Sequence, residues 1–276
     1  MKNYKIASIL LTGILMVGCA TNPFTGKKTM ALVPNNNLFA SSFQQYDTFL
    51  KENKVVTGTA DAKLVAKVGE NIRKAAETYL KANGYSDYLK DYKWEYKLVD
   101  DKAANAWCMP GGKIVVYTGI LPITKTEAGL ATVMGHEVAH ALANHGQQRM
   151  SASTLQQLGA AGVTLATGNS SAQTQQLAMA AYGAGSNLGG MLPFSRKHET
   201  EADEIGLILM AIAGYNPSDS IAFWERMAQQ GGSAQPEFLS THPSNTTRIN
   251  NLKELIPKAK REAALYQTKN TTLKKS

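Results

Sequence analysis

Two histidines and a glutamate in one short stretch of the chain have the types and the spacing that metal-assisted hydrolysis needs. His136, Glu137 and His140 form the pattern H-E-x-x-H. On a helix, residues four apart lie one turn apart on the same face, so both imidazoles can bind one tetrahedral Zn²⁺. Glu137 can then accept a proton from a water held in the open position of the metal. The pattern therefore predicts hydrolysis of an amide bond.

The alternative is a chance pattern on a polar helix surface. The chain has only five histidines, and chance rarely places two of them around a glutamate at this spacing. The flanking residues also favour a buried helix that begins near Thr126 and Glu127. Its apolar residues recur at spacings of three and four, as a helix face requires. They are Leu130, Val133, Met134, Val138, Ala141 and Leu142.

A catalytic zinc has three protein ligands, so a third ligand must lie elsewhere in the chain. The extended pattern H-E-x-x-H-x-x-G-x-x-H would supply it nearby, but its last two fixed positions hold Ala143 and Gly146. His145 is one residue away from the required position and points elsewhere on a helix. We expect His145 at the surface or behind the ligands, and the third ligand further along the chain.

A charged stretch after position 192 offers this ligand. A helix that starts between positions 193 and 195 would place Glu199 and Asp203 on one face. Glu199 can then bind the metal, and Asp203 can hold the other ring N–H of a ligating histidine. Glu201 falls on a different face. His198 is an alternative ligand, but no acidic residue four positions later supports it.

One further histidine lies far from both of these segments. Hydrolysis builds negative charge on the carbonyl oxygen, and a hydrogen-bond donor opposite the metal stabilises that charge. His242 stands before Pro243, which restricts its backbone, and it is our candidate for this donor. An ordinary loop histidine is the alternative.

A β-hairpin is expected just before the metal helix. Residues 105–109 and 113–118 flank the turn sequence Pro110-Gly111-Gly112. If the first of these strands lies at a sheet edge, it can bind an extended peptide through main-chain hydrogen bonds. Asn105, Ala106 and Trp107 are then candidates for substrate contact. An ordinary core hairpin is the alternative.

The first residues resemble an export signal. Lys2 and Lys5 precede an apolar stretch, 6–17, that is too short to span a bilayer. It ends in the sequence MVGC, which resembles a bacterial lipobox in which Cys19 is lipidated and becomes the mature N-terminus. The alternative is an ordinary signal peptide with an incidental cysteine. No aspartate follows Cys19, so we expect a bacterial cell-envelope location on the periplasmic side, at the outer rather than the inner membrane.

Composition excludes some classes of protein. The net charge is +8 and the pI is about 9.3, but no basic block or stacking motif accompanies them, so no nucleic-acid partner is expected. A basic surface that faces anionic lipids is the milder interpretation. With Cys19 acylated, Cys108 has no intrachain partner and is expected as a buried thiol.

Residues 151–192 contain no charged side chain. Glutamines and serines interrupt this stretch too often for a transmembrane span, so short alanine-rich helices joined by glycines fit better. A permissive connector is the simpler interpretation. The alternative is a mobile element that covers the cleft or touches a membrane or a partner.

Together the motifs resemble those of the M48 metallopeptidases, a family that includes CAAX-processing enzymes and a bacterial heat-shock protease. The segment from Asn22 to Val33 also resembles that of the M48 lipoproteins. The chain lacks the transmembrane helices and the helical repeats of other members. The shared motifs are H-E-x-x-H, S-R-x-x-E-x-E-A-D at 195–203, N-A-W at 105–107, P-G-G at 110–112, S-T-H-P at 240–243, and Arg248.

The resemblance implies an α+β fold, namely a mainly helical, zincin-like domain of the gluzincin type with a small sheet beside the active-site helix. It implies the same three zinc ligands, with one Zn²⁺ per chain, and Glu137 as the general base. It also implies that Asp203 supports a ligand and that Arg248 supports His242. We expect a signal peptide at 1–18, a lipidated tether at 19–36, a peptidase domain at 37–268 and a flexible basic tail at 269–276.

The implied activity is that of a zinc endopeptidase that acts in the quality control of envelope proteins. Its partners would be unfolded or misassembled protein substrates, with the membrane reached through the N-terminal lipid. A chaperone-like assembly factor that binds unfolded envelope proteins, with hydrolysis secondary, is the alternative. A structural lipoprotein with an inactive metal site is disfavoured, because Glu199 and His242 accompany an intact H-E-x-x-H.

Overall fold

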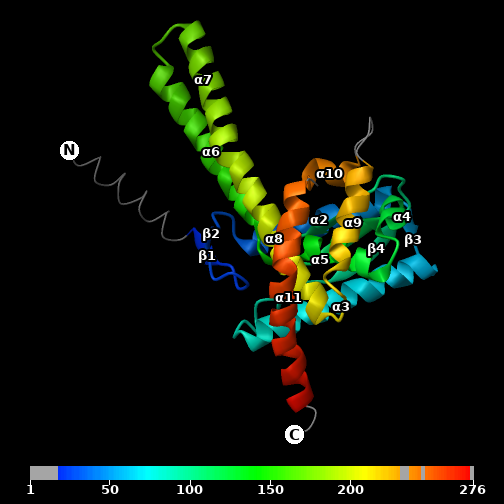
Figure 1. The fold of residues 1–276 in the computed structure, drawn as a ribbon. Helices are drawn as coiled ribbons and strands as arrows, with labels where there is room; N and C mark the ends of the chain where they lie inside the picture. Colours follow the sequence, from blue (N-terminus) through cyan, green and yellow to red (C-terminus); the bar gives the residue numbers. More distant parts are fainter. Residues whose placement is uncertain (1–17, 231–235, 244–245, 274–276) are drawn as a thin grey trace. The chain divides into compact units, whose positions relative to one another are not determined.

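A computed structural model describes residues 18–230, 236–243 and 246–273 of the chain (Figure 1). The α-helices are α2 (Asn35–Glu52), α3 (Ala60–Ala82), α4 (Leu121–Thr124), α5 (Glu127–Leu142), α6 (His145–Thr167), α7 (Ala172–Ser186), α8 (Leu192–Ile212), α9 (Asp219–Gln229), α10 (Glu237–Thr241) and α11 (Thr246–Leu273). A 3₁₀-helix, η1 (Thr118–Ile120), and a π-helical turn, η2 (Asn187–Met191), join some of them. The strands are β1 (Cys19–Thr21), β2 (Lys28–Met30), β3 (Val55–Val56), β4 (Glu95–Val99), β5 (Ala106–Met109) and β6 (Lys113–Tyr117).

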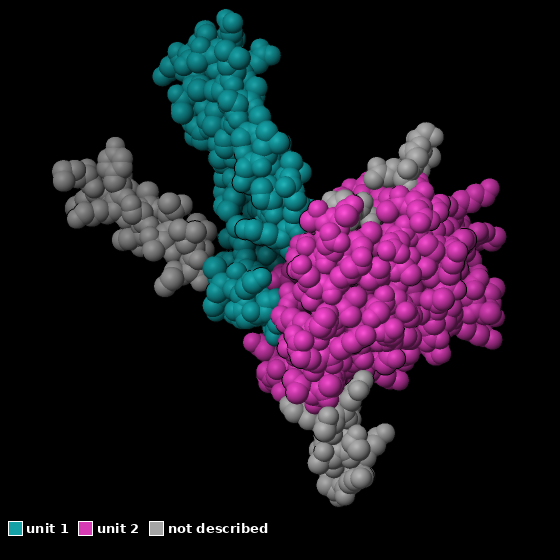
Figure 2. Space-filling model, viewed as in Figure 1, with its two compact units in different colours: residues 1–38, 144–198 teal, residues 39–143, 199–276 magenta. Residues whose placement is uncertain are grey.

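The chain divides into two compact units (Figure 2). Unit 1 consists of residues 1–38 and 144–198, and unit 2 of residues 39–143 and 199–276. The boundary after α5 falls at Asn144, whose φ of 55° is left-handed and ends one helix before the next begins. The second boundary falls within α8, between His198 and Glu199.

Unit 2 is built on a four-stranded sheet in the order β3-β4-β6-β5. Strands β4 and β6 are parallel, and the other two pairs are antiparallel. Helix α3 packs on β4, α5 packs on β5 and on α3, and α9 packs on α5. The fold is therefore mainly helical α+β with a small sheet beside the helix of the H-E-x-x-H pattern, which confirms the predicted fold class.

The β5–β6 hairpin is confirmed, and β5 lies at the edge of the described sheet. Its turn needs glycine at two positions, because Gly111 and Gly112 have φ values of 87° and 89°. A Cβ at Gly111 would also come within 2.6 Å of Phe43. The turn thus lets aromatic side chains pack directly on the backbone.

Helix α3 covers one face of this sheet. Thr59 caps it, since its side chain accepts a hydrogen bond from the N–H of Ala62 at 3.1 Å. Its apolar stripe is buried, and Gly69 makes room for the ring of Tyr96. The cap and the buried stripe are what an amphipathic helix requires.

Unit 1 combines a β-hairpin with a pair of helices. Strands β1 and β2 pair antiparallel, with Cys19 opposite Met30, within the segment for which a tether is predicted. The N–H of Leu32 donates to Ser151 Oγ at 3.0 Å, which links this segment to α6. Helices α6 and α7 lie side by side (Figure 1).

The helices of unit 1 are longer than expected. Residues 151–192 were expected to form short helices, but α6 has 23 residues and α7 has 15. Gly159 explains part of this difference, because Tyr182 of α7 packs where its Cβ would be and donates a hydrogen bond to the carbonyl of Gln156. In the described part of the chain, no helix combines the length and the apolar character that crossing a bilayer requires.

Candidate metal centre and active site

Helix α5 positions the two histidines in the interior of unit 2. Thr126 caps the helix by accepting a hydrogen bond from the N–H of Gly129 at 3.0 Å, as its predicted role requires. Every residue from Gly129 to Leu142 is buried. His136 and His140 therefore lie on a rigid element away from bulk water.

Close packing of two helices brings the third candidate ligand to the histidines. A Cβ at Gly206 of α8 would lie 3.0 Å from the backbone nitrogen of His136. One at Gly135 of α5 would lie 3.1 Å from the carbonyl oxygen of Gly206. Glu199 and Asp203 precede Gly206 by seven and three residues, so all three share one face of the helix. This face is the one turned to α5.

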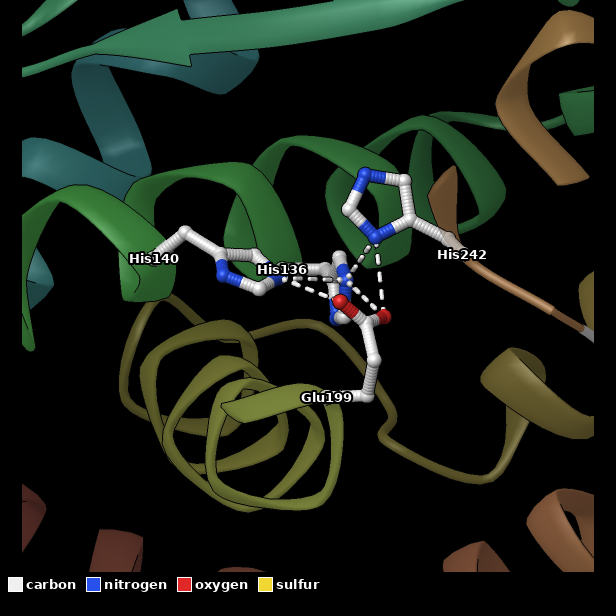
Figure 3. A group of neighbouring side chains, drawn as sticks. All are labelled: His136, His140, Glu199 and His242. Carbon is white, nitrogen blue, oxygen red and sulfur yellow. Dashed lines mark hydrogen bonds and ion pairs between the residues drawn. The ribbon is translucent and has the colours of Figure 1, made fainter. Parts of the chain in front are cut away.

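The ligand atoms of His136, His140, Glu199 and His242 lie within 4.8 Å of one another (Figure 3). The two histidine Nε2 atoms are 3.1 Å apart. Glu199 places Oε2 at 3.3 Å from His136 Nε2 and Oε1 at 3.3 Å from His140 Nε2. Zinc bonds of 2.0–2.1 Å in a tetrahedron put ligand atoms about 3.3 Å apart. The donor set therefore fits a zinc ion.

Asp203 lies behind His136, on the side away from the other ligands. Its Oδ1 is 3.0 Å from His136 Nδ1 and 2.6 Å from a terminal nitrogen of Arg248. A carboxylate at this distance holds the proton on Nδ1, which leaves the Nε2 lone pair for a metal. The structure thus places Asp203 and Arg248 beside His136. The resemblance had implied a contact of Arg248 with His242, and its ion pair here is with Asp203.

Arg248 is held from several sides. Its guanidinium lies 3.5 Å above the ring of Trp224, and it donates to the carbonyl of Pro243 at 3.2 Å. It also lies 3.4 Å from Glu199 Oε2. Stacking on an aromatic face and charge-assisted hydrogen bonds fix an arginine in one orientation. No local sequence pattern indicates this contact, because Trp224 and Arg248 belong to different helices.

His242 joins the same cluster. Its Nδ1 is 2.8 Å from Glu199 Oε2 and 3.1 Å from His136 Nε2, and its Nε2 is 3.3 Å from Glu137 Oε1. The ring of Phe238 packs on it at a centroid distance of 4.6 Å. Helix α10, which ends just before His242, was not expected from the sequence. His242 is close enough to act either as a donor to substrate or as a further ligand.

The histidines and carboxylates of the cluster shift one another's pKa values. Burial lowers the pKa of His136, but hydrogen bonds to Asp203 and Glu199 outweigh it and raise that pKa to about 9. Burial raises the pKa of Glu199, but hydrogen bonds to His136, His140 and His242 hold it far below its usual value. Without a metal the cluster therefore carries a proton on His136 and a charge on Glu199.

Glu137 faces the site from the same helix as the histidines. Its side chain is buried, and its Oε1, 3.3 Å from His242 Nε2, accepts no hydrogen bond of regular geometry. A buried carboxylate oxygen without a hydrogen bond is costly, so its presence points to a use in binding or catalysis. Cys108, in contrast, is a thiol whose pKa burial raises well above its usual value, as expected for an unreactive cysteine.

The candidate substrate strand is tied to the element that carries His242. The N–H of Phe238 donates to the carbonyl of Ala104 at 3.2 Å, just before β5. Ala106 is buried, and Asn105 accepts a hydrogen bond from the N–H of Tyr117 at 3.0 Å. Trp107 packs edge-on against Phe49 in the core. The side chain of Trp107 is thus partly buried against the core.

The other two histidines lie in unit 1. His145 and His198 stack on each other with ring centroids 4.0 Å apart, and both are buried. His145 was expected at the surface or behind the ligands, and the structure buries it in this stack instead. His198 contacts Gln148 and Phe194 within the same unit. Neither belongs to the cluster that could hold a metal.

Comparison with known proteins finds peptidases. The chain is 37% identical over 205 residues to the mitochondrial metalloendopeptidase OMA1 of Saccharomyces cerevisiae, which covers 71% of this chain and 57% of that protein. It is 41% identical over 184 residues to OMA1 of Schizosaccharomyces pombe, with 64% and 51% covered. It is 30% identical over 164 residues to the beta-barrel assembly-enhancing protease of Escherichia coli, with 56% and 33% covered. The chain spans about half the length of the first two relatives.

These relatives contradict the predicted location in a bacterial cell envelope with the outer membrane favoured. The two with the higher identities, 37% and 41%, are mitochondrial proteins. The prediction rested on the basic and apolar residues before Cys19, and residues 1–17 lie outside the described part of the chain. Short basic and apolar segments occur in targeting signals of more than one compartment, so this composition did not determine the location.

The family assignment rests on a longer match than any single motif provides. The model of the family described as peptidase family M48 matches residues 67–256. This range contains α5, the part of α8 that carries Glu199 and Asp203, and His242 with Arg248, so it includes every residue of the cluster. The chain therefore belongs to peptidase family M48.

Proposed function

We propose that the chain is a zinc-dependent endopeptidase with one metal site. The observation that carries the proposal is the convergence of His136, His140 and Glu199 at the separations that tetrahedral zinc requires. A zinc ion held by these residues would acidify a water and polarise a substrate carbonyl. The relatives called metalloendopeptidases support the same activity.

The residues of the chain take distinct parts in this reaction. Glu137 accepts the proton of the attacking water through its buried Oε1 and passes it to the leaving amine. His242 donates from Nε2 to the oxygen on which negative charge develops. Asp203 holds the His136 ring in place, and Arg248 holds Asp203. The edge of β5 aligns an extended peptide by main-chain hydrogen bonds.

The proposed substrates are unfolded or misassembled proteins, because only an extended segment can pair with a sheet edge. The full chain should cleave a permanently unfolded protein such as reduced, alkylated lactalbumin, and should leave its folded, disulfide-bonded form intact. Removing metal with a chelator should abolish cleavage, and stoichiometric Zn²⁺ should restore it. Cleavage that persists in fully metal-free protein would refute the proposal.

The ligand set has its own test. Glu199→Gln should lose most of the bound zinc, because it removes a charged ligand, while Glu201→Gln on the same helix should keep about one zinc per chain. Metal content measured by plasma spectrometry on both purified variants decides between the two residues. Equal zinc in both would show that Glu199 is not a ligand.

A second candidate function is that of an assembly factor that binds unfolded proteins, with hydrolysis secondary. The name of the Escherichia coli relative, which refers to assembly, favours it. Glu137→Gln separates the two functions, since it removes hydrolysis and leaves binding. If this variant and the unaltered chain suppress aggregation of an unfolded protein equally, binding is a function that does not depend on hydrolysis.

Cys19 is the proposed site of lipid attachment. Its side chain is exposed in β1 and forms no disulfide. The proposal concerns acylation alone, and mass spectrometry of the mature chain tests it. An unmodified cysteine, or a mature N-terminus at another residue, would count against it.

A further inference from the structure

Helices α6 and α7 expose apolar side chains that no other part of the described chain covers. Past Ser151, no residue of α6 is buried, and α7 has none. Among the described residues, nine large hydrophobic side chains are exposed, and eight of them lie between positions 150 and 192. They are Met150, Leu155, Leu158, Leu165, Leu177, Met179, Leu188 and Leu192. An apolar surface of this kind marks an interaction site.

These side chains gather on common faces. Leu155, Leu158 and Leu165 are spaced by three and seven residues, so they share one face of α6. The contact of α6 with α7 through Gly159 and Tyr182 lies next to this face, because Gly159 follows Leu155 by four residues. Leu165 is 84% exposed and Leu177 is 65% exposed, although they flank the turn that joins the two helices. Exposed leucines therefore occur along the helix pair, from the turn between α6 and α7 to the opposite end of the pair.

The charges of unit 1 have a single sign. All 21 aspartates and glutamates of the chain lie in unit 2, and unit 1 has none. Residues 151–192 carry no charge at all, but exposed cations lie just outside both ends of this stretch, at Arg149 and Lys197. Because the two helices form a hairpin, both ends of this stretch, and these cations with them, are at its base and not at its turn. An apolar tip over a cationic base is complementary to a bilayer with anionic headgroups.

A groove of about 330 Å³ adds to this arrangement. It lies between α6, α7, η2, the first turn of α8 and β2, and its apolar lining includes Met30, Leu155 and Phe194. Met30 pairs with Cys19 in the β1–β2 hairpin. An acyl chain of a bilayer lipid fits such a site by size and polarity. The groove and the exposed leucines therefore belong to one unit and favour one kind of partner.

We propose that the α6–α7 hairpin docks on a phospholipid membrane, with its leucines in the acyl region and Arg149 and Lys197 at anionic headgroups. Glutamines and serines on both helices keep this contact at the interface. A second copy of the chain is a poorer occupant, because it would bring two units without acidic residues together. The docking goes beyond peptide hydrolysis and does not depend on it.

The test uses the full chain with Cys19→Ser, so that no attached lipid contributes. Flotation with vesicles of phosphatidylcholine containing about a third phosphatidylglycerol should recover the protein with the lipid. Replacing Leu158, Leu165 and Leu177 by glutamine should lower the partition coefficient by about 10²-fold, since three apolar side chains are lost from the contact. Leu265→Gln is the matched control, because Leu265 is 58% exposed in α11 of unit 2, and it should change nothing.

Two further measurements test the role of the cations and exclude a dimer contact. Arg149→Gln with Lys197→Gln should weaken binding to the anionic vesicles and leave binding to pure phosphatidylcholine unchanged. Sedimentation without vesicles should show the same mass for the triple leucine variant and its parent. The proposal is wrong if the parent does not float, if the triple variant floats equally well, or if the leucines prove to hold a dimer together instead.

Discussion

Asp203 determines which nitrogen of His136 faces the other ligands. It lies 3.0 Å from Nδ1, and Arg248 stacks on Trp224 and holds the carboxylate in turn. A ligand oriented by two successive contacts loses little conformational freedom when metal binds. The i and i+4 spacing of Glu199 and Asp203 was visible in the sequence because it is local. The Trp224 contact was not, because it joins residues of different helices and leaves no periodic pattern.

The proton on His136 predicts a pH dependence of zinc binding. Its pKa is raised to about 9, and only the neutral imidazole binds metal, so protons compete with zinc below that pH. Apparent zinc affinity should therefore rise about ten-fold per pH unit from about pH 7 and level off above about pH 9. Competition with a chromophoric chelator across this range measures it. A flat affinity would show that His136 is already neutral.

His242 is predicted to act on the transition state. A donor aimed at a developing oxyanion gains strength only as charge appears, so its loss lowers kcat and leaves KM nearly unchanged. His242→Phe should lose about 10²–10³-fold in kcat and keep its zinc. Kinetics on one peptide and a metal assay check both parts. Loss of zinc would make His242 a ligand instead, which its 2.8 Å contact with Glu199 also permits.

At the scale of the helix, the site depends on how closely α8 approaches α5. Gly206→Ala places a Cβ 3.0 Å from the backbone of His136, so the two helices must separate and Glu199 must move with α8. This variant should unfold at a lower temperature and bind zinc more weakly. Gly162→Ala is the matched control, because a Cβ there meets nothing within 4 Å and alanine favours helix by up to about 1 kcal/mol.

Thermal unfolding of the metal-free and zinc-loaded forms of both variants measures these effects. Gly162→Ala should be as stable as the parent or more so. If Gly206→Ala unfolds like its parent and binds zinc equally well, the close approach of α5 and α8 is not what positions Glu199.

The elements differ in how far the sequence determines them. Helices α3 and α5 were predictable because a capping threonine and an apolar repeat point to the same structure. Helices α6 and α7 were expected to be broken at their glycines, since glycine disfavours helix. Gly159 is instead stabilised by Tyr182 across the pair. Short α10 ends just before His242 and is held by a hydrogen bond from the N–H of Phe238 to the carbonyl of Ala104. This contact is not local, so no sequence pattern predicts it.

At the scale of the whole molecule, chemistry and charge are divided between the two units. Every residue of the candidate metal cluster lies in unit 2, together with all the acidic side chains. Unit 1 carries cations, Cys19 and the uncharged helices. The sequence predicted one peptidase domain at 37–268, because the motifs run through this range, and this boundary stays a prediction. The division into two compact units depends on tertiary contacts, which the sequence does not show.

We propose that His136, His140 and Glu199 hold a zinc ion beside Glu137, which serves as the base. The variant Glu137→Gln tests this proposal, because the amide keeps the size of the side chain and removes only the ability to accept a proton. Zinc content and kcat should be measured on the same preparation with one peptide. We expect about one zinc per chain, unchanged thermal stability, and a loss of several orders of magnitude in kcat. A metal-loaded variant that cleaves the peptide at the unaltered rate would contradict it.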